Sequence, residues 1–394
     1  MRSILIVFLF ATSLVSQDLN IFQPRRFGGS TYQQALGYGG LASYRNGIIN
    51  IKNPASWVEQ RLTIFEFNLA SYSRSLSSNS ANTSYQSTNF EGLNWVSSVK
   101  DSTLSIGFTL SPFQDQHVSI LNKLTDYPLD AEHTLDANQY INLGGSINQF
   151  SFGAAYRAND QWFLGLSVDY YSGSLSSEVK LEQVNSSFIN YNVKVSTTAY
   201  GLNFGLSTLY RVNDQLSVAA FFSPKNTVKT SVKEVVTIRN QENIETKSVS
   251  DPFHLPQRLS LGLNWKFEDS GNIYLDYDNE DWDQSAKSLN KFSLSYQSTA
   301  SSNVFDSFIE RTNFMLGAYY YNDVFGTLNG EDINVFGFTA GAAIPFSFNR
   351  NHLFISAGYA KRGSISKNNF DESIFTINIG FSVGDFWYQP EIED

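Results

Sequence analysis

The sequence has 394 residues, of which 15% are aromatic and 16% charged, with no cysteine and a net charge of −10. The lack of cysteine excludes a disulfide framework and a thiolate zinc site, and the acidic balance argues against a nucleic-acid partner, because phosphate binding needs a basic surface. A soluble domain usually carries about 25% charged residues. The low charge and the high aromatic content of this chain therefore favour a β-barrel wall that separates lipid from a polar lumen.

Residues 1–16 are predicted to be a secretory signal peptide. Arg2 supplies the positive start, and the apolar run at 4–10 is too short to cross a membrane. The mature chain is expected to start near Gln17. No later stretch of about 18 apolar residues occurs, so any membrane crossing must be made by strands.

Residues 17–61 are rich in glycine and show no long alternation, which predicts an N-terminal hatch in a barrel lumen or a periplasmic tail. A wide barrel is an open channel unless something fills it, and this favours the hatch. Pro54 removes a backbone donor and holds Asn53 extended, so Asn53-Pro54-Ala55 interrupts any helix there, as an ordinary turn would also do. Gly39 and Gly40 fit either tight packing in the lumen or a flexible linker.

From about Leu62 onward, apolar and polar residues alternate in runs of roughly ten, the length that a tilted strand needs to cross a bilayer. In the last run, every second residue from Phe375 to Val383 is apolar, and the residues between them are small or polar. A strand places successive side chains on opposite faces, so this run has one apolar face. Periodicity alone does not tell whether that face meets lipid or a soluble core.

The predicted fold class is all-β: a transmembrane antiparallel up-and-down β-barrel of about 14 strands over residues 62–384, followed by a C-terminal periplasmic tail at 385–394. An even strand number agrees with single-chain bacterial barrels. The predicted strands are 62–73, 84–98, 102–112, 147–157, 161–173, 196–211, 215–224, 256–267, 271–281, 288–298, 311–322, 333–347, 351–361 and 373–383.

Two classes of connection alternate between these strands. Short polar turns, such as Arg157 to Asp160, are expected in the periplasm, and longer connections are expected outside the cell. The predicted external loops are 113–146, 174–195, 225–255, 322–332 and 363–371. The connection at 299–310 breaks the rule, because it is too long for a tight periplasmic turn.

Many aromatic residues lie near the ends of predicted strands, as interfacial girdles require, although aromatics also simply favour strands. These residues are Tyr156, Trp162, Tyr170, Tyr210, Trp265, Tyr277, Trp282 and Tyr359.

Three sequence features resemble chemical sites, but none has the full pattern of one. The acidic run at Asp276, Asp278, Glu280, Asp281 and Asp283 could bind a hard cation, but a solvated junction between a strand and a loop is favoured. The four histidines show no metal-ligand spacing and no GxSxG serine lies near them. The glycines do not form a dinucleotide fingerprint. We therefore predict no catalytic residue, no metal and no cofactor, and no enzyme activity.

The glycine-rich run at 35–42, followed by Asn53-Pro54-Ala55, resembles the opening of the FadL/TodX family of outer-membrane transporters for fatty acids and other hydrophobic compounds. A second block, from Leu255-Pro256-Gln257-Arg258 to Trp282, is similar to another motif of that family, and further weak matches follow in the same order. The resemblance implies a fourteen-stranded barrel, a moving hatch and an external apolar groove. The chain departs from many barrels in ending without an aromatic residue. Only the hatch tripeptide carries over, with Gly39 and Gly40 beside it.

The leading hypothesis is passive, hatch-gated uptake of a hydrophobic small molecule, such as a long-chain fatty acid, across the outer membrane of a Gram-negative bacterium. The ligand-binding residues are unknown at this point. A non-transport barrel that serves as a structural or secretion-apparatus partner is the alternative, and a polar porin is disfavoured by the hatch. The expected partners are the ligand, outer-membrane lipid and lipopolysaccharide, and possible proteins.

Overall fold

The computed structural model describes residues 27–45, 47–78, 82–100, 103–128, 134–183, 190–238, 244–248, 253–267, 270–282, 288–328, 331–346 and 350–385. The predicted signal peptide and nearly all of the predicted C-terminal tail lie outside these ranges. No helix within them is both long and apolar enough to cross a membrane.

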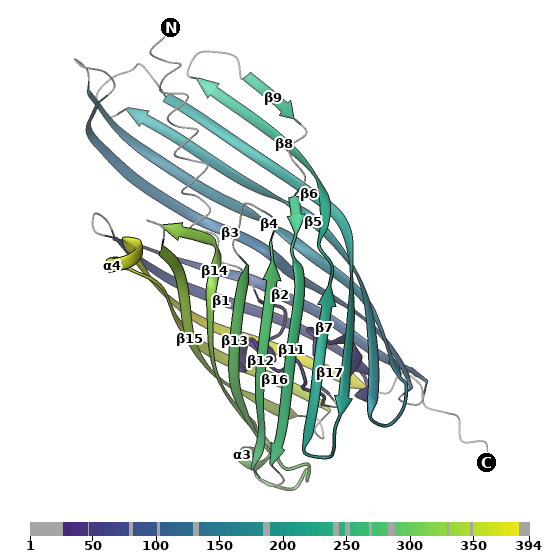
Figure 1. Ribbon diagram of the computed structural model, residues 1–394. Helices are drawn as coiled ribbons and strands as arrows, with labels where there is room; N and C mark the ends of the chain where they lie inside the picture. The colour runs from purple at the N-terminus through teal and green to yellow at the C-terminus, as the bar shows by residue number, and fades with distance from the viewer. Residues whose placement is uncertain are drawn as a thin grey trace, which may run out of the picture.

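The described strands form one closed antiparallel barrel, in which the last strand pairs with the first (Figure 1). Fourteen strands cross the wall, because β7 continues into β8, and β9 and β10 continue into β11. The prediction of a fourteen-stranded barrel is therefore confirmed. The strands are β1 (Thr63–Ser78), β2 (Asn82–Lys100), β3 (Leu104–Pro128), β4 (Thr134–Arg157), β5 (Trp162–Gln183), β6 (Asn190–Arg211), β7 (Leu216–Ser223), β8 (Asn226–Ile238), β9 (Ile244–Ser248), β10 (Phe253–Leu255), β11 (Gln257–Phe267), β12 (Gly271–Asp281), β13 (Leu289–Ser298), β14 (Asn313–Leu328), β15 (Glu331–Phe346), β16 (Asn351–Ser364) and β17 (Phe370–Asp385).

The alternation along each strand sorts side chains between lipid and lumen. On β17 the apolar residues from Phe375 to Val383 are 43 to 52% exposed on the outer wall, whereas Asn378 and Ser382 between them are buried inside. This is the reverse of a soluble sandwich, whose apolar faces point inward. Over this stretch of β17 the wall is thus apolar outside and polar inside, as in an outer-membrane barrel.

Aromatic residues mark the two edges of the lipid-facing band. On β5, Trp162 and Tyr170 are exposed on the outer wall and bound a stretch of nine residues (162 to 170), which is the span of a tilted strand. Trp282 does not belong to the girdle, contrary to the prediction. Its buried indole donates a hydrogen bond to Glu280 (3.2 Å) and its ring packs against Phe113 in the lumen.

The long external loops predicted at 113–146 and 174–195 are wrong, because most of these residues continue the strands. His117 still pairs with Gly144, far beyond the predicted strand ends, and β8 and β9 occupy part of the loop predicted at 225–255. Figure 1 shows β3 to β6 and β8 rising beyond the ends of β12 and β13. Backbone hydrogen bonds between the strands continue beyond the membrane. Because no lipid contacts the strands there, their outward side chains need not be apolar, and the sequence loses its alternation although the strands persist.

Two further connections contain short helices. The exceptional connection at 299–310 leads into α3 (Phe308–Arg311), and the predicted loop at 363–371 contains α4 (Ile365–Asn368). The helix α3 lies at the end of the barrel that carries the short turns (Figure 1).

Residues 27–62, called the inner segment below, fold inside the barrel as α2 (Thr31–Ala35), the 3-10 turn η2 (Pro54–Glu59) and connecting loops. Glycines on the wall make room for it. A Cβ atom at Gly153 would lie 2.6 Å from the Trp57 ring, and one at Gly165 would lie 2.4 Å from the backbone nitrogen of Ala55. The inner segment therefore packs directly on the backbone of the wall.

Candidate functional site

The tripeptide predicted for the hatch opens η2 and joins it to the wall. The Asn53 carboxamide oxygen accepts the Ala55 N–H (3.1 Å), which caps the turn, and Pro54 follows at the first position, where no donor is needed. The Asn53 amide donates to the backbone oxygens of Leu41 (3.1 Å) and Thr208 of β6 (3.4 Å). All three residues of the tripeptide are buried.

The predicted glycines of the inner segment meet a carboxylate of the wall. The backbone N–H groups of Gly40 (2.7 Å) and Leu41 (2.8 Å) both donate to the Asp276 carboxylate on β12. Gly40 has a φ of +80°, which only glycine adopts without strain. A Cβ atom at Gly39 would lie 2.7 Å from the same carboxylate. These glycines thus allow a close approach that a side chain would block.

A buried charge cluster next to this contact was not expected from the sequence. The ammonium groups of Lys52 (2.9 Å) and Lys291 (2.7 Å) both pair with Asp278, and both donate to the backbone oxygen of Tyr38. Burial alone would lower the pKa of Lys52, but the carboxylates of Asp278 and Asp276 outweigh it and hold this pKa above its ordinary value. Lys52 therefore stays protonated, and its charge ties the inner segment to the wall.

The acidic run that contains these residues corrects another expectation. Asp276, Asp278 and Glu280 are buried in the lumen rather than solvated at an outer junction, because alternate residues of β12 point inward. Asp281 is half exposed, and Asp283 lies outside the described residues. In the described part of the chain, no group of three or more His, Asp or Glu residues could hold a metal ion.

Further polar side chains hold the loops of the inner segment together and bind it to the wall near the short turns. The Asn50 amide donates to the backbone oxygens of Gly40 (3.0 Å), Leu41 (3.1 Å) and Ser43 (2.9 Å), so one side chain holds the loop that carries the glycines. Near the short turns, Glu59 pairs with Arg157 of β4 (2.9 Å) and with Arg211 of β6. A single sequence gives no signal for such pairs, since their members are far apart in the chain.

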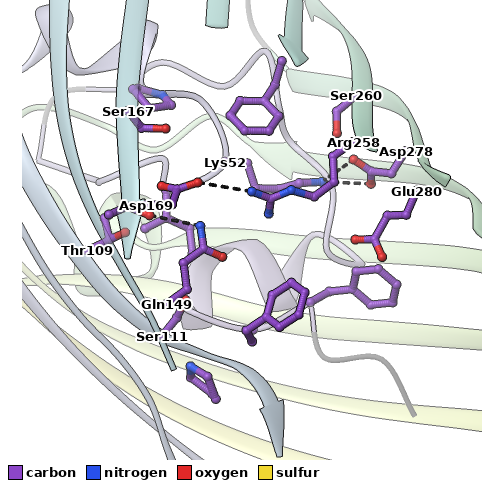
Figure 2. Close-up of a pocket in the computed structure, with 18 of the residues that line it drawn as sticks. Lys52, Thr109, Ser111, Gln149, Ser167, Asp169, Arg258, Ser260, Asp278 and Glu280 are labelled. Atoms are coloured by element: carbon purple, nitrogen blue, oxygen red, sulfur yellow. Dashed lines mark hydrogen bonds and ion pairs between the residues drawn. The ribbon is translucent and has the colours of Figure 1, made fainter. Parts of the chain in front are cut away.

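A cavity of about 130 Å³ lies between the inner segment and the wall. Figure 2 shows the charged groups that line it: Lys52 of the inner segment, Asp169 of β5, Arg258 of β11, and Asp278 and Glu280 of β12. The Arg258 guanidinium pairs with Asp169 (3.3 Å), and only β6 and β7 lie between their two strands. The cavity therefore has charged groups in a lining that also contains apolar side chains, and its cations are already paired.

Apolar side chains encircle the lumen above this cavity, and we call them the apolar collar. They are buried and come from most strands around the barrel. The order along β5 places it: Gly165 contacts the inner segment, Asp169 lines the cavity, and Tyr171 belongs to the collar. The collar thus lies on the side of the inner segment away from the short turns. Its members include Phe113, Ile147, Tyr171, Val228, Leu289 and Val335.

Solved structures of a FadL homologue and of two toluene transporters share this architecture. A Pseudomonas aeruginosa FadL homologue matches with a TM-score of 0.61 at 9% identity, over 91% of this chain and 98% of that one. The P. putida toluene transporter TodX matches with a TM-score of 0.61 at 13% identity, over 92% and 100%. The Ralstonia pickettii toluene transporter TbuX matches with a TM-score of 0.55 at 14% identity, over 91% and 98%. At such identities the likeness shows the fold alone.

A search of curated protein sequences found no match. A family model described as BamG matches residues 6–391. This match spans nearly the whole chain and includes the inner segment and every strand of the wall. The protein is an outer-membrane β-barrel with the FadL/TodX fold, and it belongs to the BamG family.

Proposed function

We propose that the protein takes up hydrophobic small molecules, such as compounds with a long alkyl chain, from outside the cell, and that the inner segment gates their path. The observation that carries this proposal is the apolar collar, which lies between the external end of the barrel and the inner segment. A polar porin would not need an apolar ring in its lumen. The lipid and lipopolysaccharide around the wall are the expected surroundings.

The collar could extract a ligand from water without an energy source, because burial of each CH₂ group contributes about 0.8 kcal/mol. The inner segment closes the path between the collar and the short turns. It is hydrogen-bonded to β6 through Asn53, to β12 through Lys52 and the Gly40 N–H, and to β13 through the Tyr38 backbone oxygen. Passage therefore requires those contacts to open. Gating by Asn53-Pro54-Ala55 and by Gly39 and Gly40 is part of the proposal.

The Ile147→Asn variant of the collar tests the apolar site. Ile147 is buried in the collar, so a polar side chain there should weaken the binding of hexadecane roughly tenfold. Native mass spectrometry of the protein in mild detergent would measure occupancy over a hexadecane titration. Thr198→Asn, which changes an exposed residue of the external wall, is the control. A wild-type protein that binds no apolar compound would contradict uptake.

A second candidate function, a structural or secretion-apparatus partner, is favoured by the connection before β14. Phe305 is 93% exposed, Ile309 69% and Phe308 55%, all outside the lipid-facing wall. Hydrogen bonds order this connection. Ser307 and Glu310 form a capping box at the start of α3, and the Ser301 N–H donates to the backbone oxygen of Glu310 (2.8 Å). Phe305, Phe308 and Ile309, which we call the apolar knob, thus form an exposed apolar patch at the end of the barrel that carries the short turns. Such a patch suits contact with a protein.

Replacing Phe305, Phe308 and Ile309 together by serine should leave the barrel folded and abolish any stoichiometric complex that depends on the knob. Cross-linking in native membranes, followed by quantitative mass spectrometry, would compare this variant with the wild type. A paired variant at Ser302 and Asn303, which are polar residues of the same connection, serves as the control. If the wild type has no stoichiometric partner, or keeps the same partner in the triple variant, the knob is not a docking site.

A further inference from the structure

The charges that line the lumenal cavity do not suit a carboxylate. Two cations, Lys52 and Arg258, face three carboxylates, from Asp169, Asp278 and Glu280. Both cations are already paired, Lys52 with Asp278 (2.9 Å) and Arg258 with Asp169 (3.3 Å). A fatty-acid carboxylate that entered the cavity would compete with these carboxylates for cations that are already neutralised.

Asp169 offers the cavity an unused acceptor. Its side chain is 1% exposed, and its Oδ2 accepts from Arg258. Its Oδ1 is buried and has no hydrogen-bond donor among the described residues. Figure 2 shows the Asp169 carboxylate at the wall of the cavity, opposite Arg258. A buried carboxylate oxygen without a donor is costly, so a bound group that donates a hydrogen bond would be stabilised there.

We propose that this cavity holds the head group of an amphiphile that donates a hydrogen bond and carries no negative charge, a protonated amine or a hydroxyl, with Asp169 as the acceptor. The proposal rests on the uptake function above and specifies its ligand. The apolar chain then lies in the collar, which adjoins the cavity because Phe113 belongs to both. Head-group selection follows from charge pairing: each cation already has a carboxylate partner, whereas the Asp169 carboxylate keeps one oxygen without a donor.

A matched series with sixteen carbons tests this assignment: hexadecylamine, 1-hexadecanol, palmitate and hexadecane. Native mass spectrometry of the full-length mature protein in a non-ionic detergent would measure competition between them. The amine should bind about tenfold more tightly than palmitate, since hydrogen bonds to charged groups are the stronger ones. If palmitate binds as well as the amine, the head-group assignment is wrong but uptake stands. If none of the four binds, uptake itself fails.

The Asp169→Asn variant sharpens the test. It removes the negative charge and leaves Arg258 without its carboxylate, so the preference should reverse in favour of palmitate. Asp281→Asn, which changes a carboxylate outside the cavity, should keep the wild-type order. An unchanged order in a folded Asp169→Asn variant would overturn the role of Asp169. If that variant does not fold, Arg258→Gln replaces it and should retain the amine preference, and loss of that preference would contradict the proposal.

Discussion

Replacing Asp278 by alanine is expected to lower the free energy of unfolding by about 3–5 kcal/mol and to release the inner segment from the wall. The ammonium groups of Lys52 and Lys291 share this carboxylate, and Lys291 is fully buried. Without Asp278, both cations stay in the lumen with no partner of comparable strength. The loss should therefore exceed that of an ordinary hydrogen bond.

Urea unfolding in liposomes would measure the free energy, and trypsin cleavage after Lys52 would report release of the inner segment. Asp281→Ala is the matched control, because its pairing with Lys225 (3.6 Å) is exposed and should contribute less than about 1 kcal/mol. Adding Lys291→Met to Asp278→Ala should recover much of the stability, since it removes one unpaired charge. An Asp278→Ala protein with wild-type stability and an uncut inner segment would show that the cluster does not anchor it.

The wall could be predicted from the sequence because lipid imposes a strict period on it. Every residue from Phe375 to Val383 faces the side that its polarity predicts. The extensions of β3 to β6 beyond the membrane could not be predicted in this way, because no lipid imposes an alternation of polarity on them. Trp282 shows a related limit. An aromatic residue at a strand end suits the girdle, but neighbouring positions of a strand point to opposite faces, and the position of Trp282 faces the lumen.

The site was only partly predictable. Asn53 and Pro54 are recognisable locally, because capping and proline geometry act over two or three residues. Asp278 and Lys52 lie 226 positions apart, so only the closed barrel brings them together. The acidic run on β12 is visible in the sequence, but its many carboxylates suggested that it is exposed to solvent. What distinguishes a buried carboxylate from a solvated one is its partners, here Lys52 of the inner segment and Lys291 of the neighbouring strand, and the alternation of a strand does not identify them.

Arginine in place of Leu206 is expected to cost about 2–4 kcal/mol of folding stability in lipid, as measured for a charge near the bilayer midplane. Leu206 is 50% exposed on the outer face of β6, between Tyr200 and Tyr210 at the two edges of the apolar band. Its surroundings there are acyl chains, so a guanidinium would lose its hydration.

Thr198→Arg is the matched control, because Thr198 is exposed on the same face of the same strand but lies beyond Tyr200, outside the band. The penalty for a charge falls to roughly 0–1 kcal/mol near the membrane interface, so this variant should fold almost as the wild type does. Equilibrium unfolding in liposomes would compare the two variants. The difference between them depends only on where lipid ends along β6. Equal stability would mean that the band between Tyr200 and Tyr210 does not face the bilayer, and the wall would then have to be assigned to another environment.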